Sequence, residues 1–104
     1  MNERIAKLPK DALAQFCRRN HIQRMSLFGS ILRDDFRPDS DVDVLVEFET
    51  GKTPGLAFFS LPQELEPIFG RSVDVTTRAA VEASENHLRR KSILDSAVEV
   101  YAGR

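Results

Sequence analysis

Two aspartates spaced two positions apart, Asp41 and Asp43, are the residues of this sequence best suited to chemistry. They open a segment, 41–48, whose polar and apolar residues alternate, which predicts a strand. Residues i and i+2 of a strand point to the same face, so the two carboxylates would converge. Two carboxylates with no Lys or Arg beside them repel each other unless a cation lies between them. Magnesium suits such a pair best, because it takes oxygen ligands from one or two carboxylates and completes its shell with water and phosphate.

A Gly-Ser pair, Gly29-Ser30, follows a short apolar segment and precedes a predicted helical turn. Because glycine has no Cβ, a phosphate can approach the backbone there, and the following amides and the serine hydroxyl can hold it. Asp74 lies in another predicted strand that could pair beside Asp43, where it would complete the metal site and help deprotonate an acceptor hydroxyl. These parts together are what phosphoryl or nucleotidyl transfer requires, since the metals neutralise a triphosphate and align the attacking and leaving oxygens.

The acidic residues of this region have two other readings. An EF-hand loop counted from Asp39 places Val44 at the required glycine and Thr50 at the bidentate glutamate, so a calcium loop of this kind is excluded. A solvated acidic loop suits the neighbouring aspartates well. It suits Asp41 and Asp43 poorly, because both belong to a predicted strand.

Other charged residues also have simpler interpretations. Asp74 between two valines could be the exposed face of an amphipathic sheet, and Arg33 could be a salt-bridge partner within a loop. For the basic run Arg89-Arg90-Lys91 a solvated helix face is the expected role, with ATP phosphates or an acidic partner as the alternatives.

Hydrophobic periodicity and turn residues predict a sequence of helices and strands around these residues. The predicted elements are a helix over 9–20, a strand over 22–28, a helical turn over 31–33, a strand over 41–48, a helix over 56–69, a strand over 72–77, a helix over 86–95 and an edge strand over 97–101. Pro62 should kink or split the predicted helix over 56–69. The order predicts an α+β domain with a small mixed sheet backed by helices.

Length and composition set further limits. With 104 residues the chain is expected to be one domain, 1–104. Its net charge of −1 gives no sign of a nucleic-acid or membrane surface, and no segment approaches the ~20 apolar residues that span a bilayer. Cys17, the single cysteine, falls on the apolar stripe of a predicted helix, so we expect it in the core. A cytoplasmic location is expected.

The motifs together resemble a known family. Gly29-Ser30-x-x-Arg33, Ser40-Asp41-x-Asp43 and Val73-Asp74-Val75 look like the signature of the polymerase-β-type minimal nucleotidyltransferases. More narrowly, the chain resembles the stand-alone prokaryotic MNT-domain proteins that are paired with HEPN-domain ribonuclease toxins. The resemblance extends over 28–101 and implies the palm-like nucleotidyltransferase fold of polymerase β.

This resemblance implies an enzyme that uses magnesium and ATP, transfers AMP to a protein hydroxyl and releases pyrophosphate. In such pairs the acceptor is a tyrosine of the cognate HEPN toxin, and its modification silences the toxin. The implied site residues are Gly29, Ser30 and Arg33 for the nucleotide or its loop, and Asp41, Asp43 and Asp74 for the metals and catalysis. One departure is visible: the family often has glycine after the arginine, whereas this chain has Asp34, which puts the conformation of the following loop in question.

The length of the chain bears on how an acceptor is bound. The chain leaves no room for the extra domain with which larger nucleotidyltransferases bind an acceptor, so we expect either a macromolecular acceptor or a second subunit, in a homo- or hetero-oligomer.

Two other functions remain as alternatives. A non-catalytic module that neutralises its partner by contact, through the aromatic-rich segment 56–69, is the first alternative. A small-molecule nucleotidyltransferase is the second alternative, and it is disfavoured because the acceptor-binding domain is missing.

Overall fold

The computed structural model of the protein describes residues 3–33, 36–37 and 39–103. Its strands are β1 (Ile22–Phe28), β2 (Val42–Phe48), β3 (Val73–Thr77) and β4 (Val98–Ala102). Its α-helices are α1 (Glu3–Ala6), α2 (Lys10–Arg19), α3 (Leu61–Phe69), α4 (Arg78–Glu82) and α5 (His87–Ser96), and two 3-10 helices are η1 (Gly29–Leu32) and η2 (Gly55–Ser60).

The four strands form one mixed sheet in the order β3-β2-β1-β4. β1 runs antiparallel to both β2 and β4, whereas β2 and β3 are parallel. The β2–β3 connection is a crossover through α3, as parallel neighbours require. This arrangement confirms the predicted small mixed sheet backed by helices, with the C-terminal strand at an edge.

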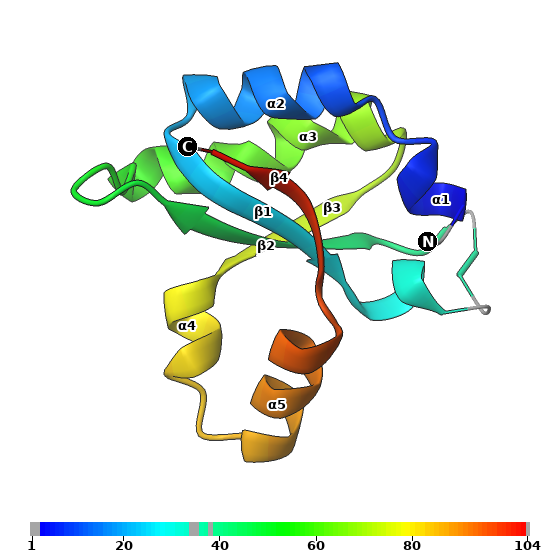
Figure 1. Ribbon diagram of the computed structural model, residues 1–104, viewed down its shortest axis with the longest axis vertical. Coiled ribbons are helices and arrows are strands. Elements are labelled where there is room, and N and C mark those ends of the chain that lie inside the picture. Colours follow the sequence, from blue (N-terminus) through cyan, green and yellow to red (C-terminus); the bar gives the residue numbers. More distant parts are fainter. Residues whose placement is uncertain (1–2, 34–35, 38, 104) are drawn as a thin grey trace.

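Helices cover the sheet on both faces (Figure 1). α2 and α3 lie on one face, where α2 packs on β1 and α3 on β3, and α4 and α5 lie on the other. The main core lies under α2 and α3 and includes Val42, Val44 and Val46 of β2, each almost fully buried. The predicted alternation of β2 is therefore confirmed for its apolar side.

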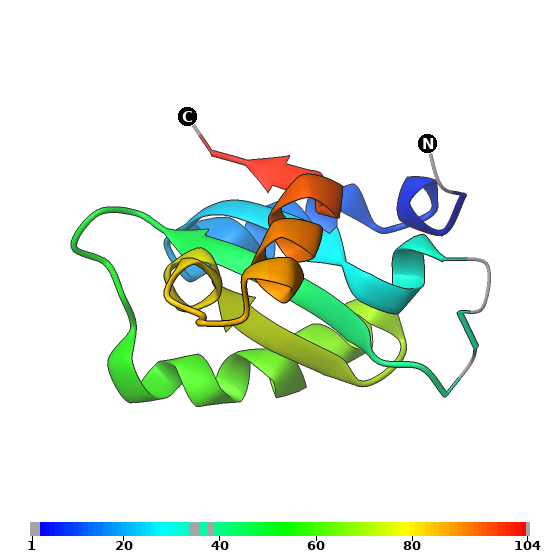
Figure 2. The same cartoon turned by 90° about the horizontal axis from the view of Figure 1, so that it is seen from below.

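A second, smaller core lies under α4 and α5 on the opposite face of the sheet, which Figure 2 shows from that side. It joins Phe28 of β1 and Leu45 of β2 to Val81 of α4 and Ile93 of α5. Leu45 shares its face with Asp43, so the helices that bury Leu45 lie on the same side of the sheet as the Asp43 carboxylate. This small core therefore determines which residues of α5 face the carboxylates.

Several element boundaries differ from the sequence prediction. The predicted strand 41–48 begins at Val42, so Asp41 precedes it, and the predicted helix 56–69 is split into η2 and α3 with Pro62 in the first turn of α3. The short helices α1 and α4 were not predicted. Among the described residues, no helix is long and apolar enough to cross a membrane.

Candidate active site

The Gly-Ser turn connects the end of β1 to η1. Gly29 has a φ of +77°, a left-handed conformation that glycine adopts without a steric penalty. The Ser30 hydroxyl donates a hydrogen bond to the backbone carbonyl of Asp41, with an oxygen–oxygen distance of 3.3 Å. The turn is thereby tied to the start of the acidic segment, although the two lie 11 residues apart in the sequence.

The sheet brings two of the predicted carboxylates side by side. Asp43 of β2 pairs in register with Asp74 of the parallel strand β3 and, on its other side, with Phe28 of β1. Asp43 is half-buried, Asp74 is exposed, and Asp41 is exposed just before β2. The prediction that Asp74 lies on a strand beside Asp43 is therefore confirmed.

The charges of this cluster act on one another. Burial raises the pKa of the Asp43 carboxyl above its ordinary value, and the negative charges of Asp74 and Asp41 raise it further. Arg89 and Arg33 oppose this rise with their positive charges. A carboxylate with a raised pKa and two acidic neighbours favours a cation at this place.

The carboxylates fit magnesium only in combination with a substrate. In the described part of the chain, no three His, Cys, Asp or Glu side chains are arranged to hold a metal ion by themselves. Magnesium does not require such a cage, because it is commonly held by one or two carboxylates together with phosphates and water. The pair Asp43–Asp74, with Asp41 near it, supplies oxygen donors of that kind.

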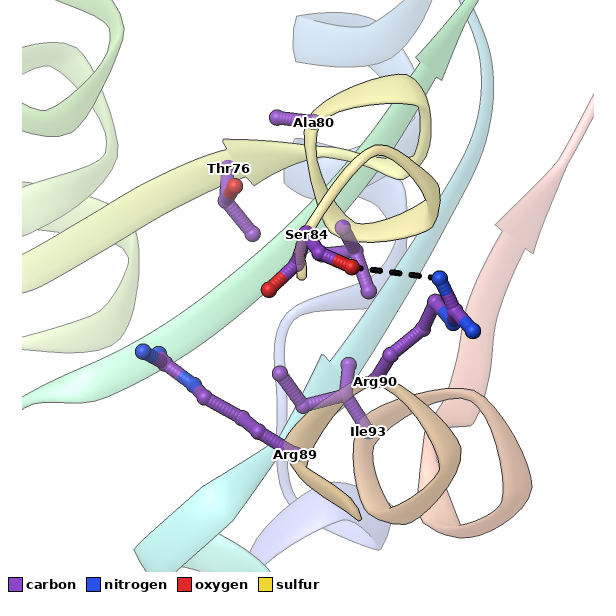
Figure 3. A pocket seen from close by; sticks show the side chains of 7 residues that line it. Thr76, Ala80, Ser84, Arg89, Arg90 and Ile93 are labelled. Carbon is purple, nitrogen blue, oxygen red and sulfur yellow. Dashed lines mark hydrogen bonds between the residues drawn. The ribbon is translucent and has the colours of Figure 1, made fainter. Parts of the chain in front are cut away.

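An open cleft of about 610 Å³ is lined by the turn and by Asp43, but not by Asp41 or Asp74. Gly29, Ser30 and Asp43 line it on the sheet side, and Arg89 and Ser92 line it from α5. The cleft thus brings together the predicted phosphate-binding turn and one of the predicted metal ligands. A smaller hollow of about 160 Å³ lies between β3, α4 and α5 (Figure 3).

Arg33 also lines the cleft. Its backbone N–H donates to the Ser30 carbonyl at 2.9 Å, and its own carbonyl accepts a hydrogen bond from Arg4 at 3.0 Å. Arg33 therefore lies at the junction between the Gly-Ser turn and the loop after it. The departure from the family pattern at Asp34 falls outside the described residues.

Arg89 lines the cleft, although the sequence favoured a solvated helix face for its basic run and gave contact with ATP phosphates only as an alternative. The charge of Arg89 also acts on Asp43. The signal that could have favoured the alternative is the place of this basic run at the start of a helix, where cations are disfavoured.

Comparison with known proteins identifies the family to which the chain belongs. The sequence model of the nucleotidyltransferase domain matches residues 10–100. A candidate protein adenylyltransferase of Methanocaldococcus jannaschii is 39% identical over 79 residues, which cover 76% of this chain and 80% of that protein. Protein adenylyltransferase MntA of Thermococcus cleftensis is 35% identical over 63 residues, 60% of this chain and 62% of that protein.

Solved structures agree in fold. A candidate minimal nucleotidyltransferase is 34% identical in sequence and superimposes with a TM-score of 0.64, covering 86% of each chain. A toxin–antitoxin structure with AMP-PNP superimposes with a TM-score of 0.68 at 19% identity, over 93% of this chain and 76% of that chain. The chain therefore belongs to the nucleotidyltransferase domain family, and it is a minimal nucleotidyltransferase with the polymerase-β-like fold.

Proposed function

We propose that this enzyme is a magnesium-dependent protein adenylyltransferase that acts as an antitoxin. It transfers AMP from ATP to a hydroxyl group, a tyrosine side chain, of a cognate HEPN-type ribonuclease toxin. The observation that carries the proposal is the packing of the Gly29-Ser30 turn against Asp43, with Asp74 in register on the next strand. The relatives named as protein adenylyltransferases and the toxin–antitoxin fold neighbour support the acceptor class.

The residues divide the reaction between them. The backbone of Gly29 and the backbone amide of Ser30 bind the triphosphate of ATP, while the Ser30 hydroxyl ties the turn to the Asp41 carbonyl. Asp41 and Asp43, with Asp74 completing the set, would hold magnesium, which when bound would neutralise phosphate charge and align the reacting oxygens. Asp74 is exposed beside Asp43, where it can accept the proton of an incoming hydroxyl and pass it to solvent.

The transfer balances as a simple displacement. The acceptor oxygen forms a bond to the α-phosphorus of ATP, the bond from that phosphorus to the bridging oxygen of the β-phosphate breaks, and pyrophosphate leaves. The hydroxyl proton goes to Asp74. The protein contributes to this reaction mainly by positioning the reacting groups and by stabilising charge.

The experiment is intact-mass spectrometry of the candidate toxin after incubation with this protein, ATP and magnesium. We expect the toxin to gain one or more AMP groups, and the double variant Asp41→Asn/Asp43→Asn to abolish the gain. Glu47→Gln is the matched control, because Glu47 lies on the same face of β2 but forms surface ion pairs with Arg24 and Arg78 instead of lining the cleft. Full transfer by the double variant would overturn the mechanism.

A contact antitoxin is the second candidate, and the exposed apolar residues of η2 favour it. Leu56 is 86% exposed and Phe59 74% exposed, although both are large apolar side chains. Such residues on a surface are typical of partner contacts. If the double aspartate variant still protects cells from the toxin while Phe59→Ser does not, neutralisation rests on contact.

A further inference from the structure

The charges of α5 run against the dipole of the helix. Arg89, Arg90 and Lys91 lie in its first two turns, and Asp95 lies in its last turn. The N-terminal end of a helix carries the positive end of the dipole, so it attracts anions and disfavours cations. A basic run at that end costs stability locally, and such a violation is typical of a functional site.

The other two cations of the run are engaged within the protein. The Arg90 guanidinium donates hydrogen bonds to the backbone carbonyls of Glu82 and Ser84, at 3.3 and 3.1 Å, and so ties α5 to α4. Lys91 forms an ion pair with Asp95 at 2.7 Å. Both therefore have structural or surface partners that account for them.

Arg89 has a different environment. Within the described ranges 3–33, 36–37 and 39–103, neither a hydrogen bond nor an ion pair holds its guanidinium. Figure 3 shows the side chains of Arg89 and Arg90 extending from α5 in opposite directions. Arg89 lines the large cleft with Gly29, Ser30 and Asp43, and it also lines the smaller hollow beside Thr76 of β3.

Arg89 therefore lines both hollows. It lines the cleft from α5, whereas the turn proposed to bind phosphates lines it from the end of β1. The charge of Arg89 acts on Asp43, but among the described residues the two form no ion pair within 4 Å. A guanidinium is always protonated and offers several donors in a planar fork that matches phosphate oxygens. An anion in the cleft would also relieve the unfavourable charge at the start of α5.

We propose that Arg89 is a substrate-binding residue that donates hydrogen bonds to the phosphates of the nucleotide, opposite the Gly29-Ser30 turn. This inference rests on the proposed function, because it assigns the nucleotide to the same cleft. The phosphates are then held between a backbone turn on β1 and a side chain on α5. These two elements pack together in the small core, which contains Phe28 of β1 and Ile93 of α5.

The test compares three variants by calorimetric binding of AMP-PNP with magnesium, without any acceptor. We expect Arg89→Ala to weaken binding by about 10- to 100-fold, the range for losing hydrogen bonds to a charged group. Arg89→Lys should restore part of the affinity. Lys91→Ala removes the same charge from the same helix outside the cleft, and it should change affinity less than about twofold.

Adenosine separates a phosphate contact from a base contact. If adenosine binds measurably, Arg89→Ala should leave its affinity unchanged. Equal affinities of Arg89→Ala and Lys91→Ala for AMP-PNP would overturn the inference, as would equal losses for adenosine and AMP-PNP. Each variant is first checked by its melting temperature; Arg89→Ala should melt at or slightly above the temperature of the parent protein, because Arg89 is exposed and its charge opposes the helix dipole.

The same proteins separate this inference from the proposed function. If the parent binds AMP-PNP, loses that binding with Arg89→Ala, and transfers no AMP to a toxin, the inference stands and the acceptor is wrong. If the parent transfers AMP and Arg89→Ala transfers it equally well at limiting ATP, the proposed function stands and the inference falls. Failure of the parent to bind AMP-PNP would overturn both.

Discussion

A Cβ atom on Gly29 would overlap the Oδ2 atom of Asp43. The two residues meet because Phe28, which precedes Gly29, pairs directly with Asp43 across the antiparallel strands β1 and β2. The turn that is proposed to bind phosphates is therefore packed against the carboxylate that is proposed to hold magnesium. Any side chain at position 29 must therefore displace either the turn or the Asp43 carboxylate.

Gly29→Ala should reduce AMP transfer by on the order of 100-fold, because a displacement of about 1 Å in a catalytic group has that effect. The alanine methyl pushes the Asp43 carboxylate from its place and resists the φ of +77°. The initial rate of toxin modification, followed by intact mass, is the measurement.

Gly51→Ala is the matched control. Gly51 also has a φ of +77°, but a Cβ atom there meets nothing within 4 Å. Both variants should lose about 1 kcal/mol of unfolding free energy from the strained backbone, measured by urea denaturation. Only Gly29→Ala should lose transfer, and an equal loss in Gly51→Ala would show that backbone strain alone explains the effect.

Asp43→Asn should abolish transfer and yet stabilise the protein without magnesium at neutral pH. Folding raises the pKa of Asp43. The contribution of Asp43 to the free energy of unfolding is therefore fully present below the ordinary pKa of aspartate, and it is lost as the pH rises through the raised pKa of the folded state. At pH 7 its charge is therefore unfavourable to folding. Asp43 is half-buried and screened by solvent, so we expect a rise in melting temperature of only about 2 °C.

The pH dependence distinguishes this effect from general repacking. The gain in melting temperature should shrink as pH falls and vanish in acid, where Asp43 is protonated in both folded and unfolded chains. Glu47→Gln should give no gain at pH 7, because Glu47 has ion-pair partners on the sheet surface. A gain that is equal at every pH would contradict the electrostatic origin.

The sequence predicted most of the fold because its patterns were locally consistent. The alternation of Val42, Val44 and Val46 predicted β2, and Val73 and Val75 flanking Asp74 predicted β3. α1 and α4 were missed because they are short, with four and five residues, and carry no hydrophobic period. The Thr77 side chain, which accepts a hydrogen bond from the Ala80 N–H, was the available signal for α4.

The site was predicted less completely than the fold, for a physical reason. The spacing of Asp41 and Asp43 and the Gly29-Ser30 pair are local signals that a sequence displays directly. The position of Arg89 depends instead on which side of α5 faces the sheet. A few contacts with Leu45 and Val81 decide that side, and they are distant in sequence.

Cys17 should resist thiol reagents while the protein is folded. Burial raises the pKa of its thiol to about 12, and the positive charge of Arg18 offsets only part of that rise. Since the thiolate is the reactive form, native protein at pH 8 should react far more slowly than protein unfolded in guanidinium chloride. Rapid labelling of native protein with a chromogenic disulfide would contradict the buried position of this residue.

Arg71→Ala should reduce AMP transfer by about tenfold, because Arg71 holds the segment that precedes Asp41 in place. Its guanidinium donates hydrogen bonds to the backbone carbonyls of Arg37 and Ser40, at 2.7 and 3.5 Å, and lies 4.3 Å from the ring centroid of Phe36. Losing these contacts should cost about 1–2 kcal/mol of unfolding free energy.

Arg78→Ala is the control for Arg71→Ala. Arg78 forms ion pairs with Glu47 and Glu82 on the surface, and such pairs contribute less than about 1 kcal/mol. Its replacement should therefore leave transfer unchanged and lower the unfolding free energy only slightly. If Arg71→Ala lost stability but kept full transfer, the position of Asp41 would not depend on this anchor, and the carboxylate would be set by β2 and the Ser30 hydrogen bond instead.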